Sequence, residues 1–324
     1  MEVMSRHIRR RSGFLAAACV LTIVMGALGA PLAQGATDNP YFDTDGLFVG
    51  TDNSAKRWLA EHPDHPRAAE IRIRIGNVAQ ARWVGPGGEG GYTADYVAAA
   101  AKDNKLPMLV AYAVPDRDCG GHSSGGLKDA DAYIAWAGRF SSSIGNRPAV
   151  VVLEPDSTLA CFDSERVRAL RGAIDALTKN APKTWVYLDA GDGRWNKPED
   201  IAPRFKQIGT QGLRGFSVNV SNYNTRKTVE AFAKGMREQG IGLPYVWDIS
   251  RNGAGPDAAG NWCNPAGREL GALPQAGGAA GADASLWIKH PGTSDGDCGA
   301  YRGTSSGEFT AQIAGDLIDA AGAP

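Results

Sequence analysis

The segment Ala149-Val-Val-Val-Leu153, followed at once by Glu154-Pro155-Asp156, decides the class of fold. Consecutive apolar residues rich in valine are typical of a strand that is buried on both faces, as in a parallel sheet. Helices cover such sheets, so the segment predicts strands and helices that alternate along the chain. The acids that end it predict a site, because functional side chains lie at the carboxyl ends of strands in α/β barrels.

Similar apolar runs recur from one end of the chain to the other. The predicted strands are 46–49, 108–114, 149–153, 185–188, 215–220, 243–247 and 285–289, with a weaker candidate at 79–84. Helix-like segments lie between them at 54–61, 92–103, 130–142, 164–179, 224–239 and 309–321. Asp163 is a candidate N-cap for the fourth of these helices. This alternation indicates βαβ units in a barrel or an open doubly wound sheet, and no glycine-rich phosphate motif follows the first strand to favour the latter.

The overall composition is that of an ordinary globular protein. The chain has 324 residues, of which 43% are hydrophobic and 21% charged, with a net charge of −1. That length allows one barrel or two small domains, and the absence of repeats and linkers favours one. A near-neutral charge gives no reason to expect nucleic acid or an anionic membrane as a partner.

The first residues have the order of a secretory signal. A basic stretch, Arg9-Arg10-Arg11, precedes an apolar run at 14–28 and a run of small residues at 29–36. We expect a signal peptide over residues 1–36, a catalytic domain over 37–324, and a secreted protein, extracellular or associated with the cell wall. The alternative, a membrane anchor, is disfavoured because the apolar run is shorter than the roughly 20 residues that a span needs.

The cysteines agree with export. Cys19 lies within the predicted signal, which leaves Cys119, Cys161, Cys263 and Cys298. An even number in an exported protein predicts two disulfides, although spacing alone allows three pairings. Zinc is the alternative, but the chain contains no CxxC pair.

Three acidic motifs follow predicted strands, and they carry the functional prediction. They contain Asp118, Asp156 and Asp295. Taken singly, Asp156 fits a cap of the next segment, Asp118 a structural partner of Arg117, and Asp295 a turn residue. Taken together, they fit the hydrolysis of a glycosidic bond, which needs one protonated acid and further carboxylates nearby. A second carboxylate raises the pKa of the first and keeps its proton available near neutral pH.

Metal binding is the competing use of clustered acids, and aromatic residues favour a sugar instead. His122 and His290 have no second ligand at a recognisable metal spacing, so we expect no metal and no cofactor. Trp195 and Trp262 lie in polar, glycine- and asparagine-rich loops rather than in apolar runs. There they can stack on the apolar face of a pyranose ring, although core packing is the commoner role of any single tryptophan.

Seven motifs follow one another along the chain: Tyr112-Ala-Val-Pro-Asp-Arg-Asp118-Cys119, Val152-Leu-Glu-Pro-Asp156-Ser157, Tyr187-Leu-Asp189-Ala-Gly191, Gly215-Phe-Ser-Val-Asn-Val-Ser-Asn222-Tyr223, Ser250-Arg251-Asn-Gly253, Trp262-Cys-Asn-Pro265 and Trp287-Ile-Lys289-His-Pro-Gly-Thr-Ser-Asp295-Gly296. With these motifs, the sequence resembles glycoside hydrolase family 6, the inverting cellulases, from about residue 39 to residue 318. The arrangement is most similar to that of bacterial endoglucanases. The resemblance implies a distorted barrel of seven parallel strands, open on one side.

The resemblance also implies roles for individual residues. Asp156 matches the proton donor, Asp118 the acid that raises the pKa of the donor and organises the attacking water, and Asp295 the proposed base. The implied substrate-contacting residues are Tyr112, Ser124, Asp189, Trp195, Asn222, Trp262 and Lys289. The implied disulfides are Cys119–Cys161 and Cys263–Cys298.

Two positions depart from the family pattern. Asp192 stands where the family usually has histidine, and Thr293 stands where it usually has glutamate. Both family residues normally contact sugar, so we expect an active hydrolase with weakened or altered substrate recognition. Each lost hydrogen bond of a charged group costs about 1.5–3 kcal/mol of binding free energy.

The leading hypothesis is therefore a monomeric, secreted endo-β-1,4-glucanase that acts with inversion on β-glucan polysaccharides or oligosaccharides. A short loop after Cys119 favours an open cleft and endo action. Two alternatives stay open: a weakly active or non-catalytic β-glucan-binding protein, and a hydrolase of another β-glucan.

Overall fold

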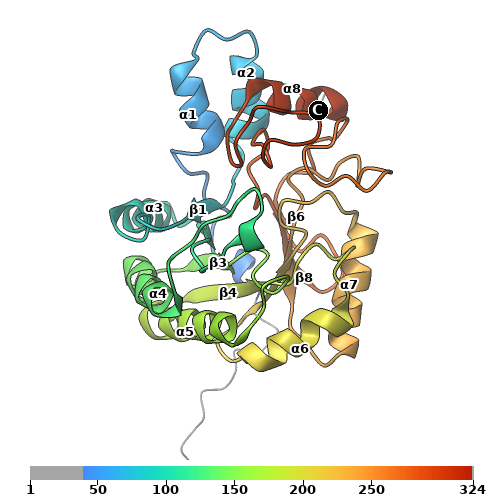
Figure 1. Cartoon of the computed structure of the whole chain (residues 1–324). Helices are drawn as coiled ribbons and strands as arrows, with labels where there is room; N and C mark the ends of the chain where they lie inside the picture. Colours follow the sequence, from blue (N-terminus) through green and yellow to red (C-terminus); the bar gives the residue numbers. More distant parts are fainter. Residues whose placement is uncertain (1–38, 323–324) are drawn as a thin grey trace, which may run out of the picture. The chain divides into compact units, whose positions relative to one another are not determined.

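The computed structural model describes residues 39–322 (Figure 1). The predicted signal peptide at 1–36 lies outside the described residues.

One curved sheet forms the centre of the fold, with strands in the order β1-β2-β3-β4-β5-β6-β8-β7. The strands are β1 (Arg82–Val84), β2 (Met108–Ala111), β3 (Ala149–Leu153), β4 (Thr184–Asp189), β5 (Gly215–Val218), β6 (Tyr245–Asp248), β7 (Gln275–Ala276) and β8 (Ala282–Leu286). Seven of them run parallel, and β7 pairs antiparallel with β8 at one edge. The prediction of a distorted, seven-stranded parallel barrel is confirmed.

The barrel is open between β1 and β8, as expected. No ladder joins these two strands in the described part of the chain. Two hydrogen bonds span the gap beyond the strand ends: the Ala81 amide donates to the Trp287 carbonyl (3.0 Å), and the Trp83 indole donates to the Ile288 carbonyl (2.8 Å). The opening is therefore narrow, and the two edges are held together.

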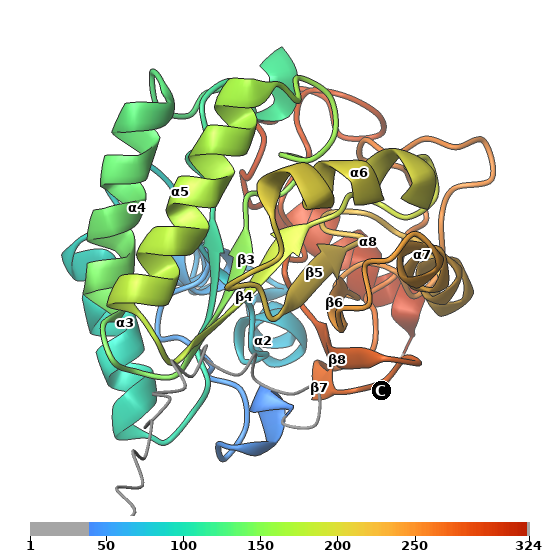
Figure 2. The same ribbon diagram turned by 90° about the horizontal axis from the view of Figure 1, so that it is seen from below.

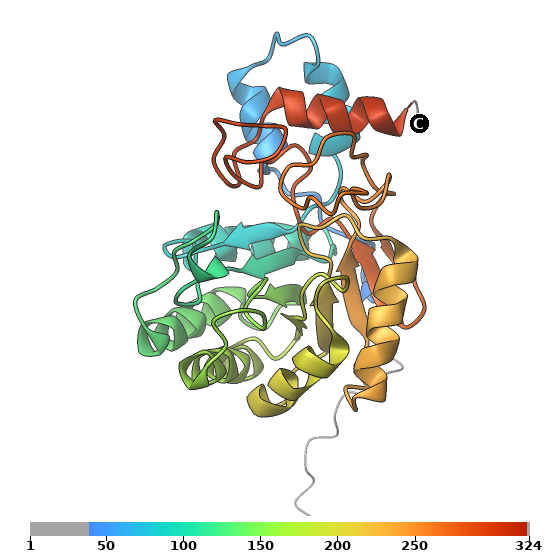
Figure 3. The same ribbon diagram turned by 45° about the vertical axis from the view of Figure 1, so that its right-hand side comes forward.

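Helices surround the sheet and also form a separate group. They are α1 (Ser54–Glu61), α2 (Ala68–Ile71), α3 (Gly91–Lys102), α4 (Ala130–Ile144), α5 (Ser164–Asn180), α6 (Pro198–Ile208), α7 (Arg226–Glu238) and α8 (Ala311–Ala321), with short turns η1 (Pro40–Phe42), η2 (Arg72–Gly76) and η3 (Asp118–Gly120). Helices α3 to α7 lie around the strands (Figure 2), whereas α1, α2 and α8 gather beside one another (Figure 3). None of the described helices is long and apolar enough to cross a membrane.

The alternation of side chains along β3 explains why its sequence is apolar throughout. Val150 and Val152 belong to the cluster inside the barrel, together with Met108, Tyr187 and Leu286. Ala149, Val151 and Leu153 belong to the second cluster, between the strands and the outer helices. Successive side chains of a strand point to opposite faces, so a strand between two apolar layers needs apolar residues at every position.

Some predicted elements differ from the structure. Residues 46–49 form only a single parallel bridge, Leu47 to Leu106, and the strand expected at 285–289 begins and ends three residues earlier. Helix α6 was not predicted. The Asp163 prediction is confirmed, since its side chain accepts a hydrogen bond from the Arg166 amide (2.8 Å) at the start of α5.

Two disulfides join loops that follow strands. Cys119 pairs with Cys161 (Cα–Cα 5.8 Å), and Cys263 pairs with Cys298 (Cα–Cα 6.0 Å), which is the pairing that the resemblance implied. The first bond connects the loop after β2 to the loop after β3. Each therefore braces a part of the chain that carries one of the candidate acids.

We predict that replacing both Cys263 and Cys298 by serine lowers the free energy of unfolding by about 4 kcal/mol, because the bond closes a long loop in the unfolded chain (sequence separation 35). Urea unfolding of the oxidised wild type and the double variant measures the difference. A matched Cys119→Ser, Cys161→Ser variant, with a sequence separation of 42, should lose a similar amount. A loss below about 1 kcal/mol in both would contradict the prediction.

Candidate active site

A cleft of about 920 Å³ lies along the carboxyl ends of the strands. The structure brings nine of the ten predicted catalytic and substrate-contacting residues to its lining: Asp118, Asp156, Asp295, Tyr112, Ser124, Trp195, Asn222, Trp262 and Lys289. These residues come from loops far apart in the sequence. Parallel strands bring them together because their carboxyl ends meet at the same edge of a sheet.

Asp156 lies in the wall of the cleft directly after β3. Its backbone is left-handed (φ 68°), and its amide donates to Asp189 Oδ2 (3.0 Å). Burial raises the pKa of the Asp156 carboxyl to about 7, and the negative charges of Asp118 and Asp192 contribute to the rise. Asp156 is therefore the acid of this cleft best able to hold a proton at neutral pH.

Asp189 occupies a different place from the one expected of a substrate contact. It is 1% exposed and lies beneath the cleft rather than in its lining. Oδ2 accepts hydrogen bonds from the amides of Asp156 and Gly191 (both 3.0 Å), and Oδ1 accepts one from the Ser217 hydroxyl (2.9 Å). Its carboxyl group thus holds the loop that carries Asp156. The sequence did not reveal this role, because a motif does not show how deeply a side chain is buried.

Asp118 faces the cleft from the loop after β2. Its backbone is also left-handed (φ 56°), and Oδ2 accepts a hydrogen bond from the Ser123 amide (2.8 Å). The alternative that Arg117 pairs with Asp118 does not hold, because Arg117 donates instead to the carbonyls of Ser123 (2.8 Å) and Tyr112 (2.9 Å). The charge of Asp118 is consequently left to act on the cleft.

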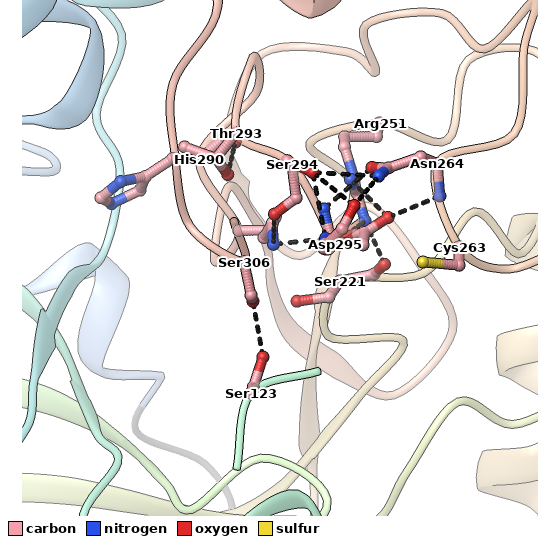
Figure 4. Close-up of polar contacts among 12 residues, drawn as sticks. Ser123, Ser221, Arg251, Cys263, Asn264, His290, Thr293, Ser294, Asp295 and Ser306 are labelled. Carbon is pink, nitrogen blue, oxygen red and sulfur yellow. Dashed lines mark hydrogen bonds and ion pairs between the residues drawn. The ribbon is translucent and has the colours of Figure 1, made fainter. Parts of the chain in front are cut away.

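Asp295 is the most heavily bonded acid of the site (Figure 4). Oδ1 pairs with Arg251 (3.0 Å) and Lys289 (3.2 Å), and Oδ2 accepts hydrogen bonds from the Asn264 amide (3.1 Å) and the Tyr223 hydroxyl (3.3 Å). Burial alone raises the pKa of Asp295, but the two positive charges outweigh it and hold the pKa below the usual range. A carboxylate in this state is stable as an anion and is a weak base.

Aromatic surfaces line the cleft beside the acids. Trp195 is 49% exposed and Trp262 is 46% exposed, as expected of side chains that stack on sugar rather than pack in the core. Tyr112 packs edge-on against Trp83 (ring centroids 5.0 Å apart). Trp83 and Tyr92 also line the cleft and were missed, although both flank the glycine-rich segment 85–91.

Asp192 and Thr293, the two departures from the family pattern, line the cleft, but their side chains form hydrogen bonds with backbone groups. Oδ1 of Asp192 accepts hydrogen bonds from the amides of Arg194 and Trp195 (both 2.9 Å), and Oδ2 is buried without a partner among the described residues. The Thr293 hydroxyl donates to the His290 carbonyl (2.7 Å). Asp192 therefore shapes the turn that presents Trp195.

The loops after β2 and β8 meet at the cleft. The hydroxyls of Ser123 and Ser306 lie 2.6 Å apart (Figure 4). His122 lies within 4.8 Å of the sulfurs of Cys263 and Cys298, which are joined as a disulfide and so offer no thiolate to a metal.

A parallel barrel with carboxyl groups of opposed pKa shifts and exposed tryptophans along one cleft belongs to the class of glycoside hydrolases. The comparison with known families agrees: the model of "Glycosyl hydrolases family 6" matches residues 43–321. The chain belongs to this family.

Individual relatives align with most of the chain. "Endoglucanase 1" of Streptomyces halstedii is 41% identical and aligns with 97% of this chain and 99% of its own length. "Endoglucanase A" of Cellulomonas fimi is 36% identical over 84% of this chain and 60% of its own length. Among solved structures, the endoglucanase Cel6 of Mycobacterium tuberculosis, in complex with methyl-cellobiosyl-4-deoxy-4-thio-β-D-cellobioside, is 38% identical with a TM-score of 0.81, covering 88% of this chain and 100% of that one.

We predict that Asp295→Ala lowers the free energy of unfolding by about 3–5 kcal/mol, since it leaves Arg251 and Lys289 buried without their counter-charge. Urea unfolding followed by tryptophan fluorescence measures the loss. The double variant Asp295→Ala, Arg251→Met should recover part of it by removing one uncompensated charge. Single and double variants of equal stability would show that the ion pairs contribute little.

Proposed function

We propose that this chain is a secreted endo-β-1,4-glucanase that cleaves internal bonds of cellulose-like glucans with inversion. The observation that carries the proposal is Asp156, a strand-end carboxyl with a pKa raised to about 7 in a cleft lined by Asp118 and two exposed tryptophans. The names and the extent of similarity of the endoglucanase relatives support the activity.

In the proposed reaction, Asp156 acts as the general acid. It transfers its proton to the glycosidic oxygen as the bond from that oxygen to the anomeric carbon breaks. A water molecule attacks the anomeric carbon from the opposite face, so the configuration inverts. Asp118 contributes in two ways, because its charge favours the protonated form of Asp156 and its carboxylate faces the cleft, where it can orient the attacking water.

A further role is that of the group that accepts the proton from the attacking water. Asp295 was the predicted base, but its two ion pairs and low pKa weigh against it. We assign Asp295 to holding Arg251 and Lys289 in place beside the cleft. The proton then leaves through water near Asp118.

The cleft provides contacts that suit a chain of glucose units. Trp195 and Trp262 offer aromatic faces for the apolar sides of pyranose rings. Ser124, Asn222 and Lys289 offer polar atoms for sugar hydroxyls, and Tyr112 lies near Asp156 at the bond that is cleaved. No cofactor takes part in this scheme.

The proposal for the cellular location rests on the sequence of the first 36 residues. We propose that they direct secretion and are removed, and that the remaining chain acts as a monomer without stable membrane association. The two disulfides support this, because such bonds persist in oxidising compartments.

Two alternatives follow from Asp192 and Thr293. A weakly active or non-catalytic β-glucan-binding protein would bind cellulose oligosaccharides without cleaving them. A hydrolase of another β-glucan would prefer a mixed-linkage or branched chain. The side chains of Asp192 and Thr293 form hydrogen bonds with the backbone and leave the three cleft acids in place. This supports altered substrate recognition rather than loss of catalysis.

We expect the wild type to cleave soluble cellulose derivatives and Asp156→Ala to lose at least about a hundredfold in kcat, because general acid catalysis contributes about 10²–10⁴-fold. A panel of soluble β-glucans, assayed by reducing-end release, measures activity and preference together. NMR of the first product should show the α-anomer. Unimpaired turnover by Asp156→Ala would sink the assignment of the acid, and a β-anomer would sink inversion.

The pH profile should reflect the proton on Asp156. Since the acid must be protonated to act, kcat/KM should fall as the pH rises through about 7. Asp192→Asn keeps an oxygen for the Arg194 and Trp195 amides but removes a negative charge, so the pKa of Asp156 falls and the basic limb moves to lower pH. Asp175→Asn, an exposed acid on α5, is the matched control and should leave the limb in place. An unmoved limb in Asp192→Asn would contradict the electrostatic argument.

A further inference from the structure

Beneath the acids of the cleft lie two buried carboxylates that the proposed mechanism does not use. Glu154 follows β3 and Asp248 ends β6, and both are 0% exposed. Neither pairs with a lysine or arginine among the described residues. Burying an unpaired carboxylate costs several kcal/mol unless hydrogen bonds compensate, so their partners show what they do.

Glu154 binds the loop that carries Asp118. Its carboxylate accepts hydrogen bonds from the amides of Ala113 (2.9 and 3.0 Å) and Val114 (3.1 Å). The ladder between β2 and β3 ends at Ala111, so these amides lie beyond the last strand pairing. The carboxylate supplies the acceptors that a longer strand would have provided, at a position four residues before Asp118.

Asp248 binds two further loops at once. Oδ1 accepts hydrogen bonds from the amides of Ser250 (2.9 Å) and Ile288 (3.2 Å). Oδ2 accepts hydrogen bonds from the amides of Lys289 (2.9 Å) and Ser221 (3.0 Å). One carboxylate thus connects the end of β6 to the segments that carry Asn222 and Lys289, and Lys289 in turn pairs with Asp295.

The two acids share one arrangement. Each is placed at a strand end, is fully buried, and accepts backbone amides from the loop of a neighbouring strand rather than a side-chain cation. Their loops bear residues that line the cleft: Asp118, Asn222 and Lys289. An ordinary stability role would not require the amides to belong to these loops, and the buried Asp283 shows the contrast. Asp283 lies at the start of β8, away from the cleft, and pairs with Arg214 (2.8 Å).

We propose that Glu154 and Asp248 are positioning residues for the glucanase reaction: their carboxylates set the relative placement of the loops that carry Asp118, Asn222 and Lys289. The inference rests on the proposed function for its kinetic consequence. Displacing a reacting group by about 1 Å can cost about 10²-fold in rate, so small shifts of these loops should be visible in kcat.

The test uses Glu154→Gln and Asp248→Asn in the full chain, each nearly identical in shape to the residue that it replaces. An amide side chain has one acceptor oxygen instead of two, so each variant should lose part of its set of backbone contacts. We expect kcat on a soluble cellulose derivative to fall about 10- to 100-fold in both variants. KM should stay within about twofold of the wild type in Glu154→Gln and rise in Asp248→Asn, because the loops held by Asp248 carry the substrate contacts Asn222 and Lys289.

Hydrogen exchange provides a second readout that does not depend on activity. Glu154→Gln should speed exchange in the peptide that contains Ala113 and Val114, and Asp248→Asn in the peptides that contain Ser221 and Lys289. Asp283→Asn is the matched control. It removes a buried carboxylate and leaves Arg214 unpaired, so it should lower stability while preserving kcat and the exchange rates of those peptides.

The outcomes separate the two proposals. A fall in kcat no larger than that of Asp283→Asn, measured where all variants are folded, would overturn the positioning role, as would unchanged exchange in the named peptides. A wild type without activity on any β-glucan would contradict the proposed function instead, and the exchange comparison would still decide whether the two carboxylates hold these loops.

Discussion

The carboxyl group of Asp189 accepts three hydrogen bonds beneath the cleft. One of them comes from the amide of Asp156, so the position of the proposed general acid depends on Asp189. Parallel strands place the two acids at adjacent strand ends, where burial raises the pKa of both carboxyl groups and the charge of Asp156 adds to the rise at Asp189. Among the described residues none donates a hydrogen bond to the Asp156 carboxyl, whereas Asp189 receives two amides and a hydroxyl. The three hydrogen bonds offset part of the effect of burial on Asp189, whose pKa still rises to about 8, so this pair of acids holds a proton near neutral pH.

Asp295, in the same cleft, shows the opposite shift in pKa. It is also buried (6% exposed), but the positive charges of Arg251 and Lys289 lower its pKa. One cleft therefore holds a carboxyl that resists losing a proton and a carboxyl that resists gaining one. Environments that push the pKa values of neighbouring acids apart are characteristic of acid–base catalysis. Here the pKa values of Asp156 and Asp295 differ because Arg251 and Lys289 form ion pairs with Asp295 and not with Asp156.

Sequence alone could predict much of the fold because the signals are local. The valine-rich β3 and the capped α5 follow from residue type and spacing, and both are as expected. Helix α6 was missed because Pro203, inside the helix, weakens the helical pattern that its apolar face provides. Most residues that line the cleft could be named from motifs, but the motifs do not show which side chains line the cleft and which are buried beneath it. Asp189 and Asp156 look alike in sequence, and only the curl of the sheet makes one a support for the other.

The same limit explains why Glu154 and Asp248 carried no prediction, although both end apolar strands. Their importance depends on where neighbouring ladders stop, which no single segment encodes. The backbone adds a cost at these ends: Asp118, Glu154 and Asp156 have positive φ angles of 56°, 51° and 68°. Each residue other than glycine that adopts the left-handed backbone conformation costs about 1–2 kcal/mol of folding free energy. The strain turns the acids out of the strand direction and persists because hydrogen bonds to buried carboxylates fix the loops. The loops that carry the acids are therefore held by other acids, and the architecture that gives Asp156 its proton also fixes where it points.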